Sequence, residues 1–357
     1  MIWYEAGDIV AVSIPFTAGV VAAAFLPLGG EAYLWPALCS SVMALLCLGL
    51  ACRAGKRTLS VMGLFFMLGV MSFCTAGMAG QPRRFSPEAA SDALQGLSLL
   101  IDSMGFASDS TGPLLKALLT GDRNSLGRET VEIFRESGAS HILALSGLHL
   151  GIIYGILAKV LSVFGNTRPV KIGRSIVIMA VSAFYAVMTG ASPSIIRAFL
   201  FICVNEMSSL APGRRRSPLT AFSTALLIQL SLDPTVALSV GFQLSYLAML
   251  GILVVYPRLK AFYPSGRGVM ALLWNSMALS LSCQLFTAPL VWLRFRTFPS
   301  FFLITNLVSL PLVEMLMVCA VSCLCCEALS GCPVIMKNLC DAFAQALLYC
   351  LDVISSL

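Results

Sequence analysis

Long apolar segments recur along almost the whole chain and are separated by short polar connections. A helix needs about 20 apolar residues to cross the hydrocarbon layer of a membrane, and ten segments reach or approach that length. The first follows Glu5 and Asp8 with no basic residue before it, so we interpret it as a span and not as a cleaved signal peptide. The pattern predicts an all-α polytopic membrane protein whose spans are residues 9–28, 33–52, 60–80, 141–164, 175–190, 194–211, 218–232, 235–256, 270–292 and 300–327.

The segment 81–140 is the sizeable polar region between the predicted spans. Ser86-Pro87-Glu88 is typical of a helix start, with a hydroxyl cap followed by a proline at a position where no amide bond is lost. A second short helix is predicted to end at Gly121, and a third is predicted over residues 125–137. Their apolar faces indicate short amphipathic helices that pack on the outer membrane surface or against the bundle.

The last apolar segment, 334–355, contains Lys337, Asp341 and Asp352. These charges favour an amphipathic helix that lies on the membrane surface over an eleventh span. The chain is then predicted to have four parts. They are N-terminal transmembrane helices (1–80), an extracytoplasmic linker (81–114), a transmembrane core (115–327) and a C-terminal amphipathic segment on the cytoplasmic side (328–357).

Lys and Arg are concentrated in every second connection between the spans. The loops 53–57, 159–174, 213–217 and 257–268 contain 13 of them, whereas the intervening short connections contain two, Arg294 and Arg296. Basic residues mark the short cytoplasmic loops of membrane proteins. The N-terminus is therefore predicted outside, the C-terminus inside, and the segment 81–140 outside.

The composition agrees with a membrane protein and excludes several other classes. Hydrophobic residues make up 58% of the chain and charged residues 11%, against about 25% charged residues in a soluble domain. Disordered, nucleic-acid-coating and collagen-like proteins are excluded. Thirteen cysteines lie mostly inside apolar runs, and seven of them fall between Cys319 and Cys350. A zinc site usually has paired Cys or His in loops with polar flanks, so we interpret the cysteines as packing thiols and predict no metal and no cofactor.

The most unusual stretch is 138–150, GASHILALSGLHL, which contains both histidines of the chain at the outer mouth of the fourth predicted span. On a continuous helix Ser146 and His149 share a face, and His141 lies about 80° from His149 around the axis. Such polar residues suit a hydrated path through a membrane. Two other interpretations stay open. One is a helix–helix contact in which Gly147 allows close approach. The other is an intramembrane hydrolase with Ser146 as nucleophile and His149 as base, although no orienting carboxylate is evident.

Further polar residues lie in or beside other spans. Thr189, Gly190 and Ser194 belong to a turn at the outer face, after which Arg197 enters the next span. An arginine at the centre of a span costs about 2.5–3.5 kcal/mol on insertion scales, and one near the end snorkels to the interface. A single buried amide commonly joins two helices, but amides on separate spans indicate a polar path. They are Gln243, Gln284 and Asn306.

Several of these segments together resemble one known family. The run from His141 to His149, preceded by LTGDR at residues 119–123, is similar to the signature of the ComEC competence family, the inner-membrane DNA-uptake channels of bacteria. Other segments resemble the family in the same order, across about residues 115–325. They are Thr189-Gly190, Pro193-Ser194, Arg197-Ala198, Phe242-Gln243-Leu244-Ser245, Ala288-Pro289-Leu290 and Asn306-Leu307.

The resemblance implies a channel in the bacterial inner membrane that conducts single-stranded DNA into the cytoplasm during natural transformation. It implies no catalytic residue, and because the sequence contains no ATP-binding motif it implies a separate cytoplasmic motor. A separate DNA receptor and nuclease are expected as further partners, and a homo-oligomer stays open. On the substrate path we expect His141, Ser146, Gly147, His149, Arg197, Gln243, Gln284 and Asn306. At the outer mouth we expect Asp122, Arg123, Thr189, Gly190 and Ser194.

The chain departs from the family in two respects. Residues 81–112 are too few for the outer OB-like domain of many members, and two histidines are too few for a metallo-β-lactamase-like nuclease site. We therefore expect a core-only member or a fragment of a longer protein. The alternative is a transporter or envelope protein that has this fold but does not transport DNA.

Overall fold

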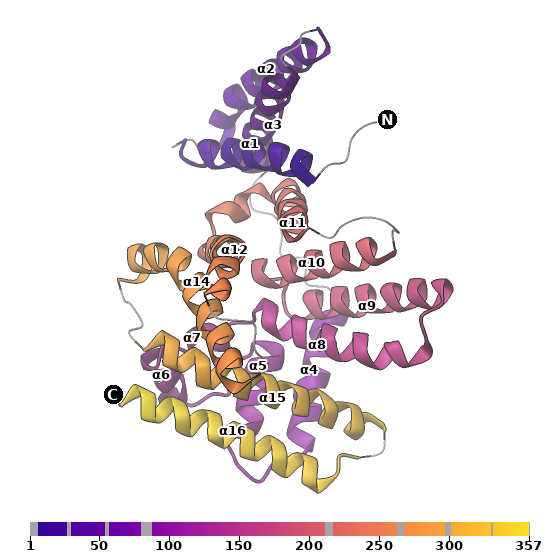
Figure 1. Ribbon diagram of the computed structural model, residues 1–357, viewed down its shortest axis with the longest axis vertical. Helices are drawn as coiled ribbons and strands as arrows, with labels where there is room; N and C mark the ends of the chain where they lie inside the picture. The colour runs from indigo at the N-terminus through magenta and orange to yellow at the C-terminus, as the bar shows by residue number, and fades with distance from the viewer. Residues whose placement is uncertain are drawn as a thin grey trace. The chain divides into compact units, whose positions relative to one another are not determined.

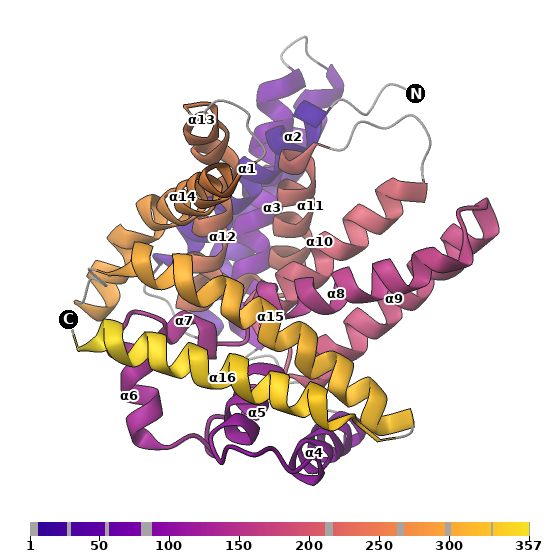
Figure 2. The same ribbon diagram turned by 60° about the horizontal axis from the view of Figure 1, so that its bottom comes forward.

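The chain is an assembly of helices. The computed structural model describes residues 6–26, 30–53, 57–79, 88–210, 217–262, 268–296, 301–329 and 331–356, and the regular structure in these ranges is helical (Figures 1 and 2). Within them eight helices are long and apolar enough to cross a membrane, and three shorter apolar helices accompany them. The predicted all-α, multi-pass membrane protein is confirmed.

All ten predicted spans contain helices, but three of them begin at unexpected positions. The eighth, predicted from residue 235, begins with the short η3 (Pro234–Leu238), which is followed by its α-helix, α12 (Val240–Val254). The fifth, α9 (Arg168–Met188), starts inside the predicted basic loop 159–174, with Pro169 in its first turn, where proline is well tolerated. The fourth, α8 (Gly147–Leu161), starts six residues later than expected. The residues before it form a separate short helix, α7 (Ser140–Leu143), followed by extended backbone at Ala144.

The chain forms two compact units, and the first consists of residues 1–84 and 200–245. Residues 200–245 thus group with the N-terminal helices, which divides the predicted core 115–327. In this unit α3 packs against α1 and α2, and α1 packs against α11. Its elements are α1 (Ala6–Ala24), η1 (Gly30–Tyr33), α2 (Leu34–Arg53), α3 (Arg57–Ala79), the later part of α10 (Pro193–Leu210), α11 (Pro218–Leu232), η3 (Pro234–Leu238) and the start of α12 (Val240–Val254).

Reciprocal glycines bring α1 and α3 of the first unit into backbone contact. A Cβ atom on Gly19 would lie 2.0 Å from the carbonyl oxygen of Phe66, and one on Gly69 would lie 2.2 Å from that of Phe16. Any larger side chain would force the helices apart. Small residues at such crossings are the usual means by which helices associate in lipid, where there is no hydrophobic drive between them.

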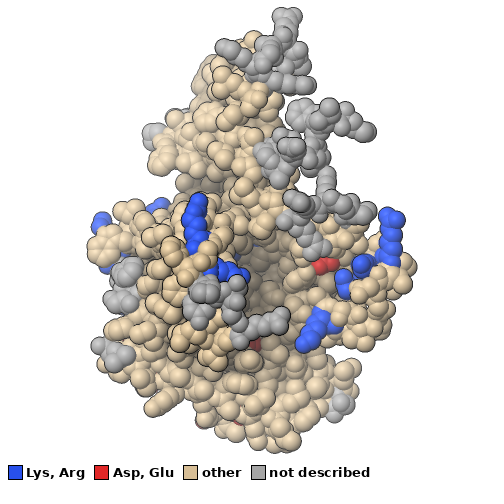
Figure 3. Space-filling model, viewed as in Figure 1, with Lys and Arg blue, Asp and Glu red and all other residues tan. Residues whose placement is uncertain are grey.

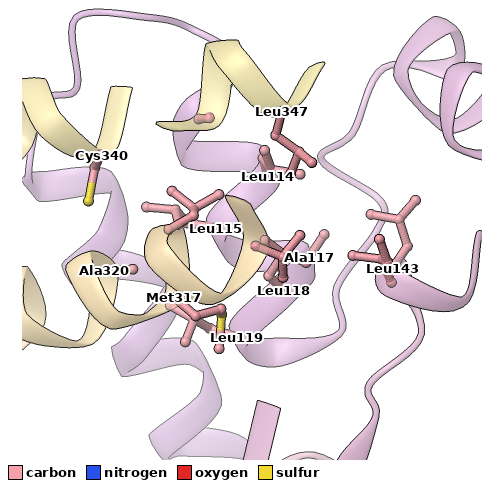
Figure 4. Packing of buried hydrophobic residues seen from close by; sticks show 14 of the residues in the cluster. Leu114, Leu115, Ala117, Leu118, Leu119, Leu143, Met317, Ala320, Cys340 and Leu347 are labelled. Carbon is pink, nitrogen blue, oxygen red and sulfur yellow. The ribbon is translucent and has the colours of Figure 1, made fainter. Parts of the chain in front are cut away.

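The second unit consists of residues 85–199 and 246–357 and contains the main hydrophobic cluster. Leu114, Leu118, Leu316 and Leu347 are fully buried there, from α5, α15 and α16 (Figure 4). Besides α7, α8, α9 and the parts of α10 and α12 already named, the unit contains α4 (Glu88–Ser103), α5 (Thr111–Thr120), α6 (Arg128–Glu136), η2 (Ser162–Phe164), α13 (Tyr256–Ala261), α14 (Val269–Phe295), α15 (Phe302–Leu329) and α16 (Val334–Ser355).

In the structure, α16 makes contacts that were not expected of a surface helix. It is itself long and apolar enough to span a membrane, and it packs along α15 and against α5 and α6 (Figure 2). Two of the three charges that suggested a water-facing helix, Lys337 and Asp341, have partners within the protein. Asp341 Oδ2 accepts a hydrogen bond from Ala107 N at 2.8 Å, and Lys337 Nζ donates to Met104 O at 2.7 Å. The segment 104–107, predicted outside, therefore contacts the helix predicted inside, so the two placements are not compatible.

The surface carries the residues expected of a protein in lipid. On the face shown in Figure 3, charged residues are few and scattered. Large apolar side chains are exposed along the spans, among them Phe184, Leu272 and Leu293. Residues 54–56, 211–216 and 263–267 of the basic loops lie outside the described residues, as do Ser86 and Pro87. The inside–outside orientation stays a prediction, except that the N-terminus cannot lie outside while the C-terminus lies inside: the ten predicted spans, an even number, put both termini on the same side.

Candidate functional site

The N-terminus of α8 is closed by a capping box built from Ser146 and His149. Ser146 Oγ accepts a hydrogen bond from Leu148 N at 3.2 Å, and Ser146 N donates to His149 Nδ1 at 3.1 Å. In this motif the N-cap and N3 side chains satisfy backbone N–H groups that the first helical turn leaves free. Because Nδ1 is an acceptor, the neutral ring carries its proton on Nε2. His149 is 1% exposed, and Nε2 has no hydrogen-bond partner among the described residues.

Two expectations about this stretch are wrong in their geometry. His141 is on α7 and not on α8, so the 80° relation to His149 does not exist. Its ring is exposed, and Nδ1 lies 3.2 Å from Gly138 O. Ser146 is the cap of α8 and not a residue inside the helix, because its backbone is extended. The sequence did not mark this boundary, since 141–150 contains no proline and no Asp, Glu, Lys or Arg.

The Ser146–His149 pair does contain the contact that a hydrolase would need. Ser146 Oγ lies 3.1 Å from His149 Nδ1. However, the same Nδ1 accepts from the backbone of Ser146, and the capping box accounts for both contacts. On the other side of the ring, Nε2 meets no carboxylate within the described part of the chain. A third group that orients the base, as in a triad, is therefore missing from these residues.

Arg197 of α10 lies against the first turn of α8. A Cβ atom on Gly147 would be 3.3 Å from Ala198 Cβ and 3.4 Å from Arg197 Nη2, so Gly147 allows the close approach. The guanidinium Cζ lies 5.8 Å from the centre of the Tyr246 ring, a cation–π distance. Its Nε and Nη1 are buried and have no hydrogen-bond partner among the described residues. A buried cation with free N–H groups at a helix N-terminus is suited to an anion.

The turn between α9 and α10 holds the predicted outer-mouth residues Thr189, Gly190 and Ser194. Gly190 has a φ of +79°, and Ala191 N donates to Ala186 O at 2.8 Å, which closes the end of α9. Thr189 Oγ1 donates to Tyr185 O at 2.8 Å. The carbonyl oxygen of Ser194 lies beside Gly147. Ser194 is thus next to the first turn of α8, while Thr189 and Gly190 have structural roles in the turn.

Asp122 and Arg123 lie in a loop that supports the entrance to α8. Arg123 Nε donates to Leu143 O at 3.1 Å, and Asp122 Oδ1 accepts from Asn124 N at 3.0 Å. Gly121 ends α5 with a φ of +80°, and a Cβ atom there would lie 2.5 Å from Leu145 Cδ1. The segments 121–124 and 143–145 are therefore in direct contact. Both belong to the stretch 119–149 that resembles the family signature.

A basic depression lies beside this loop and was not among the predicted sites. It has a volume of about 370 Å³, and Arg123, Arg128 and Arg135 line it with Glu132 as the acidic residue. Arg135 pairs with Glu132 at 3.6 Å. Both arginines of α6 have glutamates close by in the sequence, a pattern typical of a solvent-exposed helix. Only the folding of Arg123 toward α6 indicates an anion-binding surface.

The three predicted amides have different environments. Gln243, in the first unit, donates from Nε2 to Ala237 O at 2.8 Å in the preceding turn. Gln284 Nε2 on α14 and Asn306 Oδ1 on α15 are buried and have no hydrogen-bond partner among the described residues. The neighbour of Asn306, Thr305, donates from Oγ1 to Ser137 O at 2.7 Å and so fixes α15 to the end of α6.

The structure thus brings together only some of the predicted path residues. Ser146, Gly147, His149 and Arg197 form one polar cluster, which we call the α8–α10 cluster. His141 is outside it, and Gln243 belongs to the other unit. Gln284 and Asn306 resemble the cluster in one respect: each has a buried polar atom with no hydrogen-bond partner within the described ranges. Burial of such an atom costs about 1–3 kcal/mol, which indicates positions kept for a ligand or water.

Comparison with known proteins relates most of the chain to one family. The model of the family described as "Competence protein" matches residues 118–357. The chain is 28% identical to "ComE operon protein 3" of Bacillus subtilis over 70% of its length and 29% of that relative. It is 29% identical to "Recombination protein 2" of Haemophilus influenzae over 57% of its length and 27% of that relative.

A third relative and the coverage complete the comparison. The chain is 32% identical to "Competence protein ComA" of Neisseria gonorrhoeae over 41% of its length and 21% of that relative. It therefore spans less than a third of the length of each of these three relatives. No solved structure matches the chain significantly.

Proposed function

We propose that this chain, which belongs to the Competence protein family, conducts one strand of DNA across the membrane in which its helices lie. The observation that carries the proposal is the α8–α10 cluster. There a buried guanidinium and a buried imidazole hold N–H groups without acceptors in the described chain. A phosphodiester supplies negative charge and acceptor oxygens, so it satisfies both groups in turn as the strand passes.

The charge of Arg197 favours an anionic cargo over a neutral one. A buried cation is costly unless an opposite charge or polar groups compensate it. Tyr246 compensates only in part, through the face of its ring. The backbone phosphates of DNA provide the missing charge. The aromatic ring beside the guanidinium also offers a face on which a base can stack, as in other single-strand binding proteins.

The basic depression on α6 suits the point at which the strand first meets the protein. Three arginines on one surface bind phosphates at close range and release bound counterions when they do so. Glu129, Glu132 and Glu136 on α6 balance their charge at a distance. Under the predicted orientation, with the segment 81–140 outside, this depression and the loop 121–124 lie at the outer mouth. We propose that the strand passes from the depression to the α8–α10 cluster and leaves on the cytoplasmic side of the bacterial inner membrane.

The proposal gives the chain a conducting and not an enzymatic role. The Ser146–His149 contact is accounted for by the capping box, and the buried Nε2 is used as a donor. Strand separation, strand degradation and the driving force are then assigned to other proteins: a DNA receptor, a nuclease and a cytoplasmic motor. The chain spans less than a third of its relatives, so these activities are sought in other chains or in further domains.

Entry of labelled DNA into cells tests the proposal. The gene is deleted from its host and restored on a plasmid, and label that resists externally added nuclease is measured beside label bound outside. We expect the deletion to remove protected label, outside binding to persist, and the plasmid to restore entry. Unchanged protected label in the deletion strain, with no second homologue present, would contradict DNA transport and support a transporter or envelope role.

A further inference from the structure

We propose that the hairpin of α15 and α16 holds a tetrahedral metal site formed by Cys319, Cys323, Cys332 and Cys340, with zinc as the metal class. The sulfur atoms of Cys319, Cys323 and Cys340 all lie within 4.8 Å of one another, and all three residues are buried. Cys332 lies in the connection between α15 and α16 and is the fourth ligand of the proposed site. This inference does not depend on the proposed function.

The hairpin brings together three of the four sulfurs, from two different helices. Cys319 and Cys323 are four residues apart and therefore share one face of α15. Cys340 is on the facing side of α16, where its sulfur points toward α15 (Figure 4). Cys332 is in the connection between the two helices. The sequence alone did not suggest a site, because the spacing of these cysteines matches no loop motif for metal binding. They come together only when the two helices pack.

The separation of the sulfurs fits metal coordination. Cys323 Sγ and Cys340 Sγ are 3.7 Å apart. Zinc–thiolate bonds of about 2.3 Å in a tetrahedron place neighbouring sulfurs about 3.8 Å apart. A disulfide would need about 2.05 Å, and thiols that only fill space have no reason to converge from two helices.

The charge balance of the site depends on the metal ion itself. Zinc binding releases the thiol protons, so four thiolates and one divalent ion carry a net charge of −2. Lys337, one turn before Cys340, already pairs with Glu327, so the bound cation and not a neighbouring residue stabilises the thiolates. The soft sulfur set selects zinc or a similar metal over magnesium or calcium.

The chain provides a matched control on the same helix. Cys325 is exposed and Cys326 half-buried on α15, and neither belongs to the group of three buried cysteines. The double variant C323S/C340S therefore removes two ligands, while C325S/C326S makes the same chemical change away from the site. Serine is nearly isosteric with cysteine, which limits the change in packing.

Metal analysis of the purified chain tests the proposal. The protein is prepared in detergent with a tag that contains no histidine and without chelators. We expect about one zinc ion per chain in the wild type and in C325S/C326S, and loss of most of it in C323S/C340S. After exchange into cobalt(II), the wild type should show thiolate-to-cobalt charge transfer and the visible bands of a tetrahedral site.

A second measurement keeps the test valid if the double variant does not fold. Native wild-type protein is alkylated with and without a chelator, and the modified cysteines are identified by mass spectrometry. We expect Cys332 to become reactive only after chelation, whereas Cys325 reacts in both samples. Wild type without metal or tetrahedral cobalt bands, equal metal loss in both double variants, a Cys323–Cys340 disulfide, or reactivity of Cys332 that the chelator does not change would each overturn the site.

Discussion

Two sets of buried polar side chains in the second unit differ in how far the chain supplies their partners. On α16, Asp341 Oδ2 and Lys337 bind backbone groups of the segment 104–107, and Lys337 also pairs with Glu327 at 3.6 Å, while Asp341 Oδ1 has no partner among the described residues. In the α8–α10 cluster, Arg197 and His149 keep N–H groups without a partner among the described residues. The first set stabilises the fold. The second set is held in place by the capping box and by the close approach of α8 and α10 at Gly147, but these N–H groups have no acceptor in the described chain. This arrangement is expected of a site that binds a ligand.

The largest effect that separates the two sets is expected from Arg197→Ala. Two charge-assisted hydrogen bonds contribute about 1.5–3 kcal/mol each, so their loss should lower entry of labelled DNA about a hundredfold or more. The melting temperature in detergent should stay unchanged or rise, because a buried charge without a full partner is removed.

The exposed Arg168, at the start of α9, is the matched control. Arg168→Ala should leave both DNA entry and the melting temperature at the wild-type level. Equal entry in the two variants would remove Arg197 from the path, and a large fall in the melting temperature of Arg197→Ala would give it a structural role instead.

Asp341→Ala should show the opposite behaviour. The carboxylate loses its bond to Ala107 N, and the free energy of unfolding should fall by about 1.5–3 kcal/mol, as for other hydrogen bonds to charged groups. DNA entry per folded molecule should not change.

Denaturant unfolding in detergent and entry normalised to the membrane level of the protein are the measurements for Asp341→Ala. Asp352→Ala, at an exposed position on the same helix, should change stability by less than about 0.5 kcal/mol. If both variants have the same stability, the contact of Asp341 with the segment 104–107 does not hold α16 in place.

His149 has both a structural and a proposed binding role. Its Nδ1 caps α8, and its Nε2 has no partner among the described residues. His149→Gln keeps an N3 side chain that can cap the helix but removes the ring donor, so stability should stay close to wild type while DNA entry falls. His149→Ala should lose about 1 kcal/mol of stability in addition. Thermal unfolding and DNA entry of the two variants side by side check this. Wild-type entry in His149→Gln would mean that Nε2 contacts no DNA.

The smallest effect is expected at the α8–α10 crossing. Gly147→Ala places a methyl group 3.3 Å from Ala198 Cβ and 3.4 Å from Arg197 Nη2, so the guanidinium must shift by a few tenths of an ångström. DNA entry should fall by less than in Arg197→Ala. Gly151→Ala on the same helix meets no atom within 4 Å and should leave entry unchanged, with a stability gain of about 0.5–1 kcal/mol. Equal entry in both glycine variants would show that the spacing of this crossing does not matter.

The sequence predicted the helices better than their ends. Each of the ten predicted spans contains a helix, because an apolar run of that length has its backbone groups satisfied in lipid only as a helix. The start of α8 was missed because Ser146 acts as a cap through a histidine at N3, where a glutamate or glutamine is the usual signal. The surface placement of α16 stays a prediction, but its contacts with residues 104–107 could not be foreseen, because a charge in sequence does not reveal whether a distant segment binds it.

The α8–α10 cluster and the proposed cysteine site also differ in how much of each could be predicted from the sequence. The sequence by itself determined the membrane class, the helices and the motif residues Ser146, Gly147, His149 and Arg197, since composition and local spacing are properties of the chain alone. Only the tertiary structure decided that His141 lies apart from His149, that Arg123 joins the arginines of α6, and that cysteines from two helices converge. Contacts between residues far apart in sequence depend on how helices pack. That packing is set by close fits such as Gly147 against Ala198, which no single segment contains.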